Sequence, residues 1–401
     1  MKAIVNHEYG PPSVLELEDV DRPVIGDGEV LVRVLGAAVN PGDWDVMHGT
    51  PYLLRLTTGL RRPRNTVLGL AIAGQVEAVG SSVSELGPGD EVYAEVGKGG
   101  FAEYACVPAD ALAPKPSNLT FAEAAAVPLT GVTALQALRD IGRVQPGQKV
   151  LINGASGGVG TFAVQIARSL GADVTAVCSA TSAGLVRSIG ADHVIDYTQE
   201  DFTKAGRQYD LILDNVGNRG LSELRRALRP NGMLIPNSNK GSGRWLGGYL
   251  RRAVEALVVS PFVSQRLRPF AATGKREDLI ELTGLIESGK VTPVVDSTYR
   301  LSEVAEAMSH YGAGHAHGKV IITMEQNAAL PSRVAEGMGQ PGANGSNLES
   351  KWRARQVLDA RFQPTPSRSK AAMSGWSRPG WAHDRRPVAR RAAPRSNPAS
   401  G

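Results

Sequence analysis

The first 116 residues alternate short apolar runs with turns that are rich in glycine and proline. The run Val30–Leu35, for example, follows a Gly-Asp-Gly turn at 26–28. Branched apolar side chains favour extended backbone, whereas glycine and proline mark turns. The pattern predicts an all-β, partly barrel-like unit. Its expected strands are 2–5, 14–20, 29–39, 71–79 and 91–96, with one more short strand within 97–107.

The pattern changes after Leu119, where helices begin to alternate with strands. Thr120 and Glu123 have the spacing of a helix-capping box. The expected helices are 121–126, 131–140, 159–170, 182–189, 219–228, 276–288 and 302–310. The expected strands are 149–153, 173–178, 193–195, 209–213 and 232–236, followed by 291–295 and 319–323. This order predicts an α/β fold with a doubly wound parallel sheet and helices on both of its faces.

A glycine-rich loop joins the expected strand 149–153 to the helix that follows it. Its residues are Gly154, Ala155, Ser156, Gly157, Gly158, Val159 and Gly160. Glycines at the first, fourth and seventh positions permit a tight turn, let the backbone approach a pyrophosphate, and let helix and strand pack closely. Free N–H groups at the helix start would bind that pyrophosphate. The loop predicts a dinucleotide site, and a glycine-rich turn without a ligand is the alternative.

The residues that follow two later strands refine the predicted cofactor. An NAD site usually has a carboxylate after the second strand, on the ribose 2′-hydroxyl. This chain instead has small hydroxyl side chains there, Ser179 and Thr181, which would not repel a 2′-phosphate. NADPH is therefore the expected cofactor. Asn215 follows the strand 209–213, and it either contacts the ribose or amide of the cofactor or caps the next helix as an Asx-turn.

Composition places the chain among globular proteins, because 42% of its 401 residues are hydrophobic and 21% are charged. Two cysteines, Cys106 and Cys178, are too few for a disulfide framework or a four-cysteine zinc site. The first residues lack the apolar run of a signal peptide. The sequence contains no run of about 18 uncharged apolar residues, so no membrane span is expected. A reduced, cytoplasmic location is expected.

The net charge of +5 is divided unevenly along the chain. Residues 327–401 contain 13 basic and 4 acidic side chains, a net charge of +9, whereas residues 1–326 contain 31 basic and 35 acidic side chains, a net charge of −4. The basic segment has no helical or alternating period, so we expect a disordered tail. Out-of-frame translation of GC-rich DNA gives the same residue mixture. Contact of its arginines with nucleic acid is the less favoured alternative.

Several segments together resemble one family, the medium-chain dehydrogenase/reductase superfamily, in its zinc-independent quinone oxidoreductase branch. They are VNPGDW at 39–44, PLTGVTALQAL at 128–138, VLINGASGGVG at 150–160, ADHVIDY at 191–197, LILDNVGN at 211–218 and HGKVIIT at 317–323. The resemblance implies a GroES-like catalytic domain formed by 1–120 and 291–326, and a Rossmann cofactor-binding domain formed by 121–290. It also implies NADPH-dependent reduction of quinones, enones or related carbonyl compounds, and it allows a homodimer.

The resemblance assigns candidate site residues as well. Without zinc, a donor must stabilise the substrate oxygen that develops charge, and Asn40 is the candidate. Tyr52 is a candidate proton donor, and Trp44 is a candidate apolar wall. The ordinary alternatives are a turn residue for Asn40, core packing for Trp44 and a loop position for Tyr52. Three more residues would contact the cofactor: Thr130, Tyr197 and Lys319, the last of which is otherwise a solvated side chain.

A metal site is not expected from the residue pattern. Asn40 lies where the zinc enzymes of the superfamily have a cysteine ligand, and Gly69-Leu70-Ala71 replaces their Gly-His-Glu motif. His310, His315 and His317 cluster late in the chain, but no nearby acidic ligand is expected for them. Ordinary surface histidines are therefore favoured over a metal site.

Two further segments allow more than one interpretation. Arg55, Arg61, Arg62 and Arg64 form a basic patch that is either solvated or steers an anionic cofactor. Residues 241–257 form either a lid over the substrate or an amphipathic surface helix.

The leading hypothesis is a zinc-independent NADPH-dependent oxidoreductase that transfers hydride to a quinone or an α,β-unsaturated carbonyl. One alternative is an NAD(P)-dependent alcohol dehydrogenase or carbonyl reductase. The other is a non-catalytic NADPH-binding sensor that contacts RNA through the arginine-rich tail. The expected partner is a small-molecule carbonyl or quinone substrate, and no membrane partner is expected.

Overall fold

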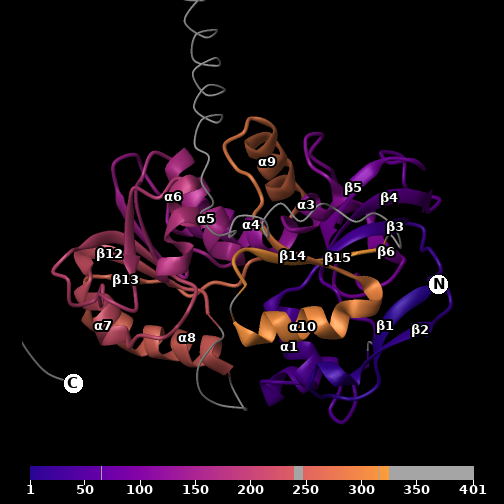
Figure 1. Ribbon diagram of the computed structural model, residues 1–401, viewed down its shortest axis with the longest axis horizontal. Coiled ribbons are helices and arrows are strands. Elements are labelled where there is room, and N and C mark those ends of the chain that lie inside the picture. Colours follow the sequence, from indigo (N-terminus) through magenta and orange to yellow (C-terminus); the bar gives the residue numbers. More distant parts are fainter. Residues whose placement is uncertain (65, 239–246, 315, 325–401) are drawn as a thin grey trace, which may run out of the picture. The chain divides into compact units, whose positions relative to one another are not determined.

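A computed structural model describes residues 1–324, apart from 65, 239–246 and 315 (Figure 1). All of these residues belong to one compact unit, Met1–Ala329. The expected tail 327–401 therefore lies outside the described residues.

The β-rich part is built on a seven-stranded sheet. Its main path runs through β14 (Val295–Arg300), β15 (Lys319–Thr323), β3 (Glu29–Ala38), β4 (Ala71–Val79), β5 (Glu91–Glu95) and β7 (Ala113–Pro114), and β6 (Tyr104–Pro108) also pairs with β3. The β14–β15 pair is parallel, and the other described pairs of this sheet are antiparallel. A separate antiparallel pair consists of β1 (Lys2–Asn6) and β2 (Leu15–Asp19).

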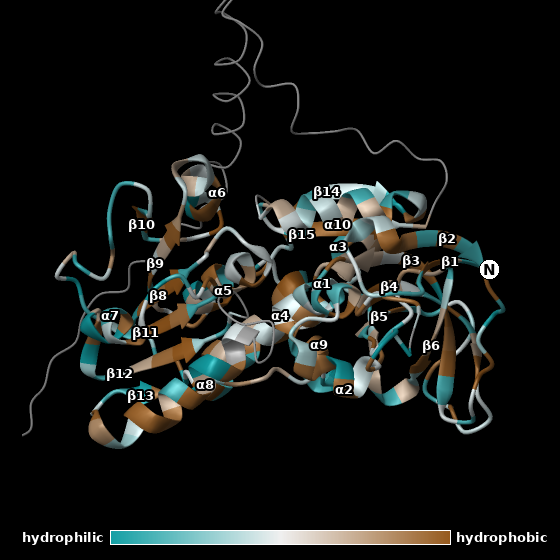
Figure 2. Cartoon of the chain, turned by 90° about the horizontal axis from the view of Figure 1, so that it is seen from below, coloured by the Kyte–Doolittle hydropathy of each residue, from teal (hydrophilic) through white to brown (hydrophobic). Residues whose placement is uncertain are grey.

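The second sheet is wholly parallel, in the order β10-β9-β8-β11-β12-β13. This is the Rossmann order, in which the chain starts at the centre and winds first to one edge and then to the other. The strands are β8 (Lys149–Asn153), β9 (Asp173–Cys178), β10 (His193–Asp196), β11 (Tyr209–Asp214), β12 (Leu228–Pro236) and β13 (Arg266–Leu267). Their central members are hydrophobic along most of their length, as expected for strands that are covered on both faces (Figure 2).

Alternate residues of β8 pack into two different cores. Val150 and Ile152 pack with residues of α4 (Pro128–Leu135), α5 (Gly158–Ser169) and α9 (Arg276–Glu287). Leu151 packs on the opposite face with residues of α7 (Leu221–Arg226) and α8 (Gly247–Val259) (Figure 1). The prediction of a doubly wound sheet with helices on both faces is confirmed.

The remaining helices are short or lie against the β-rich sheet. They are α1 (Pro41–His48), α2 (Arg55–Thr58), α3 (Phe121–Ala125), α6 (Ala183–Ser188) and α10 (Val304–Ala313). Single turns precede or extend several of them: η1 (Pro12–Val14), η2 (Tyr52–Leu54), η3 (Ala109–Ala111), the π-helical η4 (Gln136–Ile141), η5 (Ala180–Ser182), η6 (Ser260–Phe262) and η7 (Leu301–Glu303).

One predicted strand is wrong, and one predicted helix begins too late. Residues 291–294 form no strand, and β14 begins only at Val295, because Pro293 has no N–H group to donate to a neighbouring strand. The helix predicted over 131–140 begins at Pro128, which suits the first turn of a helix because the missing N–H would have no partner there.

The segment 241–257 contains most of α8, which supports the surface-helix interpretation over the lid. Within it, Arg244, Trp245 and Leu246 lie outside the described residues. None of the helices in the described ranges is long and apolar enough to cross a membrane.

The last strand brings distant parts of the chain together. β15 pairs antiparallel with β3, with Ile321 opposite Ala38. Just before β15, Gly318 forms an isolated parallel bridge with Gly157 of the glycine-rich loop. The start of β15 is therefore next to both the β-rich sheet and the start of α5.

Candidate active site

The loop between β8 and α5 is a tight turn. Gly154 has a φ of +77°, in the left-handed region that favours glycine. The N–H groups of Gly154 and Ala155 both donate to the Val177 carbonyl, each at 3.1 Å, and the Gly157 N–H donates to the Gly154 carbonyl at 3.2 Å. The first N–H groups of α5 have no intrahelical acceptor, as at every helix start. The loop can therefore bind an anion at the start of a 12-residue helix.

The space around two of the loop glycines differs sharply. A Cβ at Gly160 would lie 2.1 Å from the Gly154 carbonyl oxygen and 2.7 Å from the Cα of Ala155, so only glycine lets the helix pack on the turn. A Cβ at Gly157 would meet one atom, the Gly154 oxygen at 3.5 Å, which is an ordinary contact. The open side of Gly157 is where a pyrophosphate would fit. The other predicted loop residues are half-buried: Ser156, Gly158 and Val159.

Asp214 and Asn215 lie beside this loop, at the carboxyl end of β11. Asp214 Oδ1 accepts hydrogen bonds from the N–H groups of Val216 and Gly217, at 3.2 and 3.0 Å. The Asx-turn that was the alternative for Asn215 is thus made by Asp214. Asn215 Oδ1 accepts from Asn237 Nδ2 at 2.8 Å, while the buried Nδ2 of Asn215 has no partner among the described residues. An unpartnered buried donor at this position suits an oxygen of a bound dinucleotide.

Hydroxyl and imidazole groups meet at the carboxyl end of β9. Ser179 Oγ lies 2.8 Å from Thr181 Oγ1 and 3.2 Å from Ser182 Oγ. Ser182 Oγ in turn lies 2.9 Å from His317 Nδ1. Tyr197 is 51% exposed, and its N–H donates to the last carbonyl of β9. In folds of this order the adenosine ribose of a dinucleotide lies at this strand end, so these groups surround the expected position of the 2′-phosphate.

His317 also connects to an acidic residue. Asp296 Oδ1 accepts from the His317 N–H at 2.7 Å, and Asp296 Oδ2 lies 2.8 Å from His310 Nε2. Burial alone would raise the pKa of Asp296, but hydrogen bonds from His317, His310 and Ser297 hold it below its usual value. The expectation that no acidic residue is near the late histidines is therefore wrong, because the fold brings Asp296 between two of them. His315 lies outside the described residues.

Lys319, at the start of β15, is buried against the glycine-rich loop. Its ammonium donates to the Val39 carbonyl at 2.7 Å and to Asn40 Oδ1 at 2.6 Å, and only 4% of the residue is exposed. The alternative of a solvated Lys319 is therefore wrong. A Cβ on Gly158 would come within 2.9 Å of Lys319 Cδ and 3.3 Å of Thr130 Cγ2. The loop, Thr130 and Lys319 thus meet at one place, and their contacts with a cofactor stay a prediction.

Asn40 is fully buried, and its amide is held in one orientation. Its Nδ2 donates to the Ala38 carbonyl at 2.8 Å, and its Oδ1 accepts from Lys319. The Asp43 carboxylate, in the first turn of α1, accepts from the N–H groups of Asn40 and Gly69 at 2.9 and 3.0 Å. The Asn40 side chain also hydrogen-bonds to the Asp43 carboxylate, which acts to lower the pKa of Asp43.

Asp43 and Lys319 are buried groups of opposite charge in one cluster. Burial raises the pKa of Asp43 to about 7, although the N–H groups of Gly69 and Asn40 and the charge of Lys319 act to lower it. Burial lowers the pKa of Lys319 to about 7, and the charge of Asp43 acts in the opposite direction. Buried groups that titrate near neutral pH are typical of catalytic sites.

Trp44 and Tyr52 have packing contacts within and beyond their own elements. The Trp44 ring lies 6.1 Å from the Tyr311 ring, and a Cβ on Gly312 would lie 2.2 Å from it, so Trp44 packs α1 against α10. Tyr52, in η2, has its ring 4.8 Å from the Arg55 guanidinium. Core packing thus accounts for the position of Trp44, and the chemical roles of both aromatic residues stay predictions.

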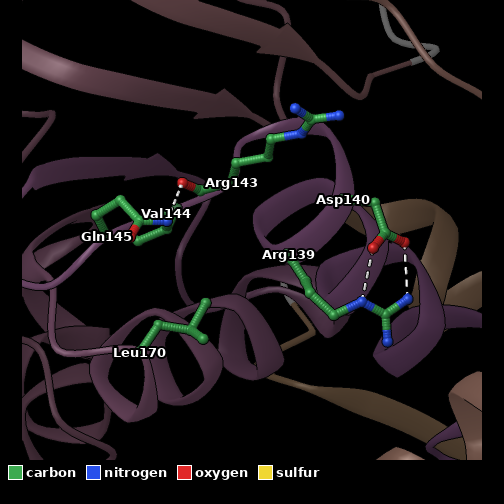
Figure 3. Close-up of a pocket in the computed structure, with 6 residues that line it drawn as sticks. All are labelled: Arg139, Asp140, Arg143, Val144, Gln145 and Leu170. Carbon is green, nitrogen blue, oxygen red and sulfur yellow. Dashed lines mark hydrogen bonds and ion pairs between the residues drawn. The ribbon is translucent and has the colours of Figure 1, made fainter.

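A surface pocket lies outside this cluster. It is lined by Arg139, Asp140, Arg143, Val144, Gln145 and Leu170 (Figure 3). In Figure 3 the Arg139 guanidinium faces the Asp140 carboxylate, which it contacts at 2.6 Å. Arg139 also pairs with Asp278 at 2.6 Å and with Glu281. None of the predicted site residues lines this pocket, so we do not assign it to the cofactor.

Comparison with known proteins decides the family. Residues 26–117 match the alcohol dehydrogenase GroES-like domain, and residues 189–322 match a model described as zinc-binding dehydrogenase. The mouse mitochondrial NAD(P)H oxidoreductase RTN4IP1 is 33% identical over 358 residues, which cover 81% of this chain and 89% of that protein. The chain belongs to the medium-chain dehydrogenase/reductase superfamily.

Other similar proteins place the chain within this superfamily. The chloroplastic NADPH-dependent alkenal/one oxidoreductase of Arabidopsis thaliana is 34% identical over 336 residues, covering 80% of this chain and 79% of that protein. The structure of the quinone oxidoreductase from Coxiella burnetii has a TM-score of 0.72 and 29% identity, covering 81% of this chain and 99% of that one. The chain therefore belongs to the zinc-independent, quinone oxidoreductase-like branch of the medium-chain dehydrogenase/reductase superfamily, and it binds a nicotinamide cofactor.

The buried residues Asn40 and Lys319 do not fit zinc, the metal named in the description of one matching family. A catalytic zinc needs about three ligands from cysteine, histidine or a carboxylate. Asn40, which the resemblance places where the zinc enzymes have a ligand, is an amide bonded to the Lys319 ammonium, and a nearby ammonium repels a dication. Across the described ranges, no group of three histidine, cysteine, aspartate or glutamate side chains could hold a metal ion. We therefore derive no step through zinc.

Sequence reasoning missed three residues of this site. Asp43 lies inside the VNPGDW segment, and its capping distance from Asn40 could have indicated that it contacts the Asn40 backbone. Ser182 and His317 are 135 residues apart, so no local pattern could have paired them.

Proposed function

We propose that the protein reduces quinones or α,β-unsaturated carbonyl compounds with NADPH. One observation carries the proposal: the glycine-rich loop, a strand end without a carboxylate, and the buried Asn40–Lys319 pair lie along one side of the parallel sheet. The names of two similar proteins support it, since one is an NADPH-dependent alkenal/one oxidoreductase and the other a quinone oxidoreductase. NADPH, when bound, supplies the hydride.

Different residues of the chain would bind different parts of the cofactor. The N–H groups around Gly157 would hold the pyrophosphate, and the free Nδ2 of Asn215 would donate to a ribose or amide oxygen. Ser179 and Thr181 would donate to the 2′-phosphate, and His317 would hold the Ser182 hydroxyl beside it. This set favours NADPH over NADH, because each of these groups tolerates or attracts a dianion.

The buried Asn40–Lys319 pair acts on the substrate oxygen. As negative charge develops on that oxygen, the Lys319 ammonium and the Asn40 amide beside it provide a positive potential that stabilises the charge. Lys319 acts here as a positioning residue, because it fixes which end of the Asn40 amide faces the site. Trp44 and Tyr52 are not needed for this arrangement.

Product analysis tests the proposed reaction. Purified protein is incubated with NADPH and a panel of quinones, enones and simple ketones, and products are identified by NMR. We expect quinols or saturated ketones. Allylic alcohols from enones would instead support the alcohol dehydrogenase alternative. Stabilisation by NADPH without turnover of any substrate would contradict the catalytic proposal and support the sensor alternative.

Cofactor selectivity is tested at His317. His317→Ala should raise the KM for NADPH about 3–10-fold, because the Ser182 hydroxyl would lose the hydrogen bond that orients it, and should leave the KM for NADH unchanged. His310→Ala is the matched control, because His310 shares Asp296 but does not contact Ser182. Equal effects of His317→Ala on both cofactors would contradict the 2′-phosphate assignment.

The cellular compartment and the oligomeric state of the protein are proposals. Cys106 and Cys178 are both free thiols, which supports a reducing compartment such as the cytoplasm. A homodimer stays a prediction, and the molar mass in solution measures it.

A further inference from the structure

One short segment of the β-rich part exposes leucines that are close together in sequence. This leucine–arginine segment, Leu53–Arg64, covers most of η2 and all of α2 (Figure 2). Leu53, Leu56 and Leu60 are 46%, 60% and 67% exposed. Leu53 lies in η2, Leu56 lies in α2, and Leu60 follows Gly59, whose φ of +123° ends the helix, so the three leucines belong to one short segment and not to one helix face. Exposed single leucines are ordinary, but three of them within eight residues concentrate apolar surface in this segment.

The same segment carries positive charge that nothing neighbouring in sequence neutralises. Arg61, Arg62 and Arg64 are exposed, and none of them forms an ion pair with a described residue. Residues 46–76 contain no aspartate or glutamate. The leucines are therefore followed directly by three arginines that have no ion-pair partner in the part of the chain that the structure describes.

The segment is anchored to the body of the protein. The Tyr9 hydroxyl lies 2.8 Å from Thr58 Oγ1 and donates to the Gly59 carbonyl at 2.7 Å. The fourth arginine, Arg55, is used internally, because its guanidinium lies 4.4 Å from the Tyr9 ring and its Nε donates to Gly49. The exposed leucines and arginines are thus presented on a fixed support.

We propose that the leucine–arginine segment docks the protein on the surface of an anionic phospholipid bilayer. Apolar side chains that lie next to arginines match the boundary between acyl chains and headgroups, where leucines enter the apolar layer and arginines meet lipid phosphates. A nucleic acid would match the arginines but would leave the leucines in water. Binding is peripheral, since no described helix could span the bilayer. This inference departs from the expectation of no membrane partner, and it does not depend on the proposed reaction.

Vesicle sedimentation of the full chain tests the docking. Vesicles of phosphatidylcholine with 30% phosphatidylglycerol are compared with pure phosphatidylcholine. An arginine near an anionic surface changes the partition about fivefold, so Arg61→Gln, Arg62→Gln and Arg64→Gln together should lower binding about 100-fold. Leu53→Ser, Leu56→Ser and Leu60→Ser together should lower it as well. The matched control removes three exposed arginines elsewhere: Arg33→Gln, Arg207→Gln and Arg300→Gln.

A fluorescent probe shows which part of the chain meets the lipid. Leu56→Cys is labelled with an environment-sensitive dye in a Cys106→Ser background, and Val24→Cys, at a position that is 92% exposed, is the control. The dye at position 56 should shift to the blue with anionic vesicles, and the dye at position 24 should not. The proposal would be overturned if the test and control arginine variants bound anionic vesicles equally and the dye at position 56 showed no blue shift. It would also be overturned if the leucine variants changed only the oligomeric state.

Discussion

Replacing Gly160 with alanine should weaken the fold, whereas replacing Gly157 with alanine should weaken only cofactor binding. At Gly160 the new Cβ would lie 2.1 Å from a carbonyl oxygen, where ordinary contacts begin at 3.4 Å, so the turn or the helix must move by about 1.3 Å. Overpacking costs roughly 1–3 kcal/mol. Backbone atoms on the crowded side cannot rotate away, so we expect about 3 kcal/mol, the upper end of that range.

The methyl group at Gly157 meets no such obstacle. The backbone there has φ −81° and ψ 175°, which any residue adopts, and the nearest atom lies 3.5 Å away. The free energy of unfolding without cofactor should change by less than about 0.5 kcal/mol. The same methyl group occupies the space proposed for the pyrophosphate. NADPH at about 100 times its Kd stabilises the wild type by about 2.7 kcal/mol, and this gain should disappear in Gly157→Ala.

Thermal unfolding with and without NADPH measures both effects. The expected pattern is a lower Tm for Gly160→Ala in either condition, and an unchanged apo Tm for Gly157→Ala with no response to NADPH. If Gly157→Ala kept the full NADPH response, the pyrophosphate would not lie on this loop. If Gly160→Ala matched the wild type without cofactor, the steric reasoning would be wrong.

Three other changes probe the charged groups. Lys319→Met leaves the buried acceptors of Val39 and Asn40 unpaired, so kcat/KM should fall at least about tenfold. Lys115→Met, at another buried lysine, should lower only the stability, and an equal kcat/KM in the two variants would contradict the role of Lys319. Asp278→Ala removes a buried carboxylate that accepts from Arg139 and Gln136, and urea unfolding should show a loss of about 2–3 kcal/mol. A loss below about 0.5 kcal/mol would show that this pair is unimportant. Asp296 has a pKa below its ordinary value of 3.8, so its contribution is complete above that pH and is lost as the pH falls through the folded pKa. Asp296→Asn should therefore be less stable than the wild type at pH 7 and should approach it in acid, and a constant difference would contradict the assignment.

Local patterns predicted most of the fold because they depend on neighbouring residues. Thr120 caps α3 as its spacing with Glu123 predicted, and the two residues exchange hydrogen bonds at 3.3 and 2.9 Å. The strand placed at 291–295 failed where a single proline outweighed its branched neighbours. The loop 154–160 could be predicted because its chemistry is contained in seven consecutive residues.

The rest of the site could not be predicted from spacing, because its partners are far apart in sequence. Lys319 and Asn40 are 279 residues apart and become neighbours only through the pairing of β15 with β3. Lysine side chains are usually exposed to solvent, and only the tertiary structure shows that Lys319 is buried. The resemblance predicted that Lys319 lies near the cofactor, but it predicted neither the hydrogen bonds of Lys319 nor the neighbouring charge of Asp43.

The position of β15 has a consequence for how the protein acquires its activity. A ribosome must complete the chain beyond Thr323 before the strand that carries Lys319 can pair with β3, so all residues of the glycine-rich loop and of the parallel sheet are synthesised before the site can be complete. Contacts of such long sequence separation form late, because closing the intervening loop costs entropy before any contact repays it. The site is therefore completed last, and a chain truncated before residue 319 would lack the ammonium that donates to Asn40.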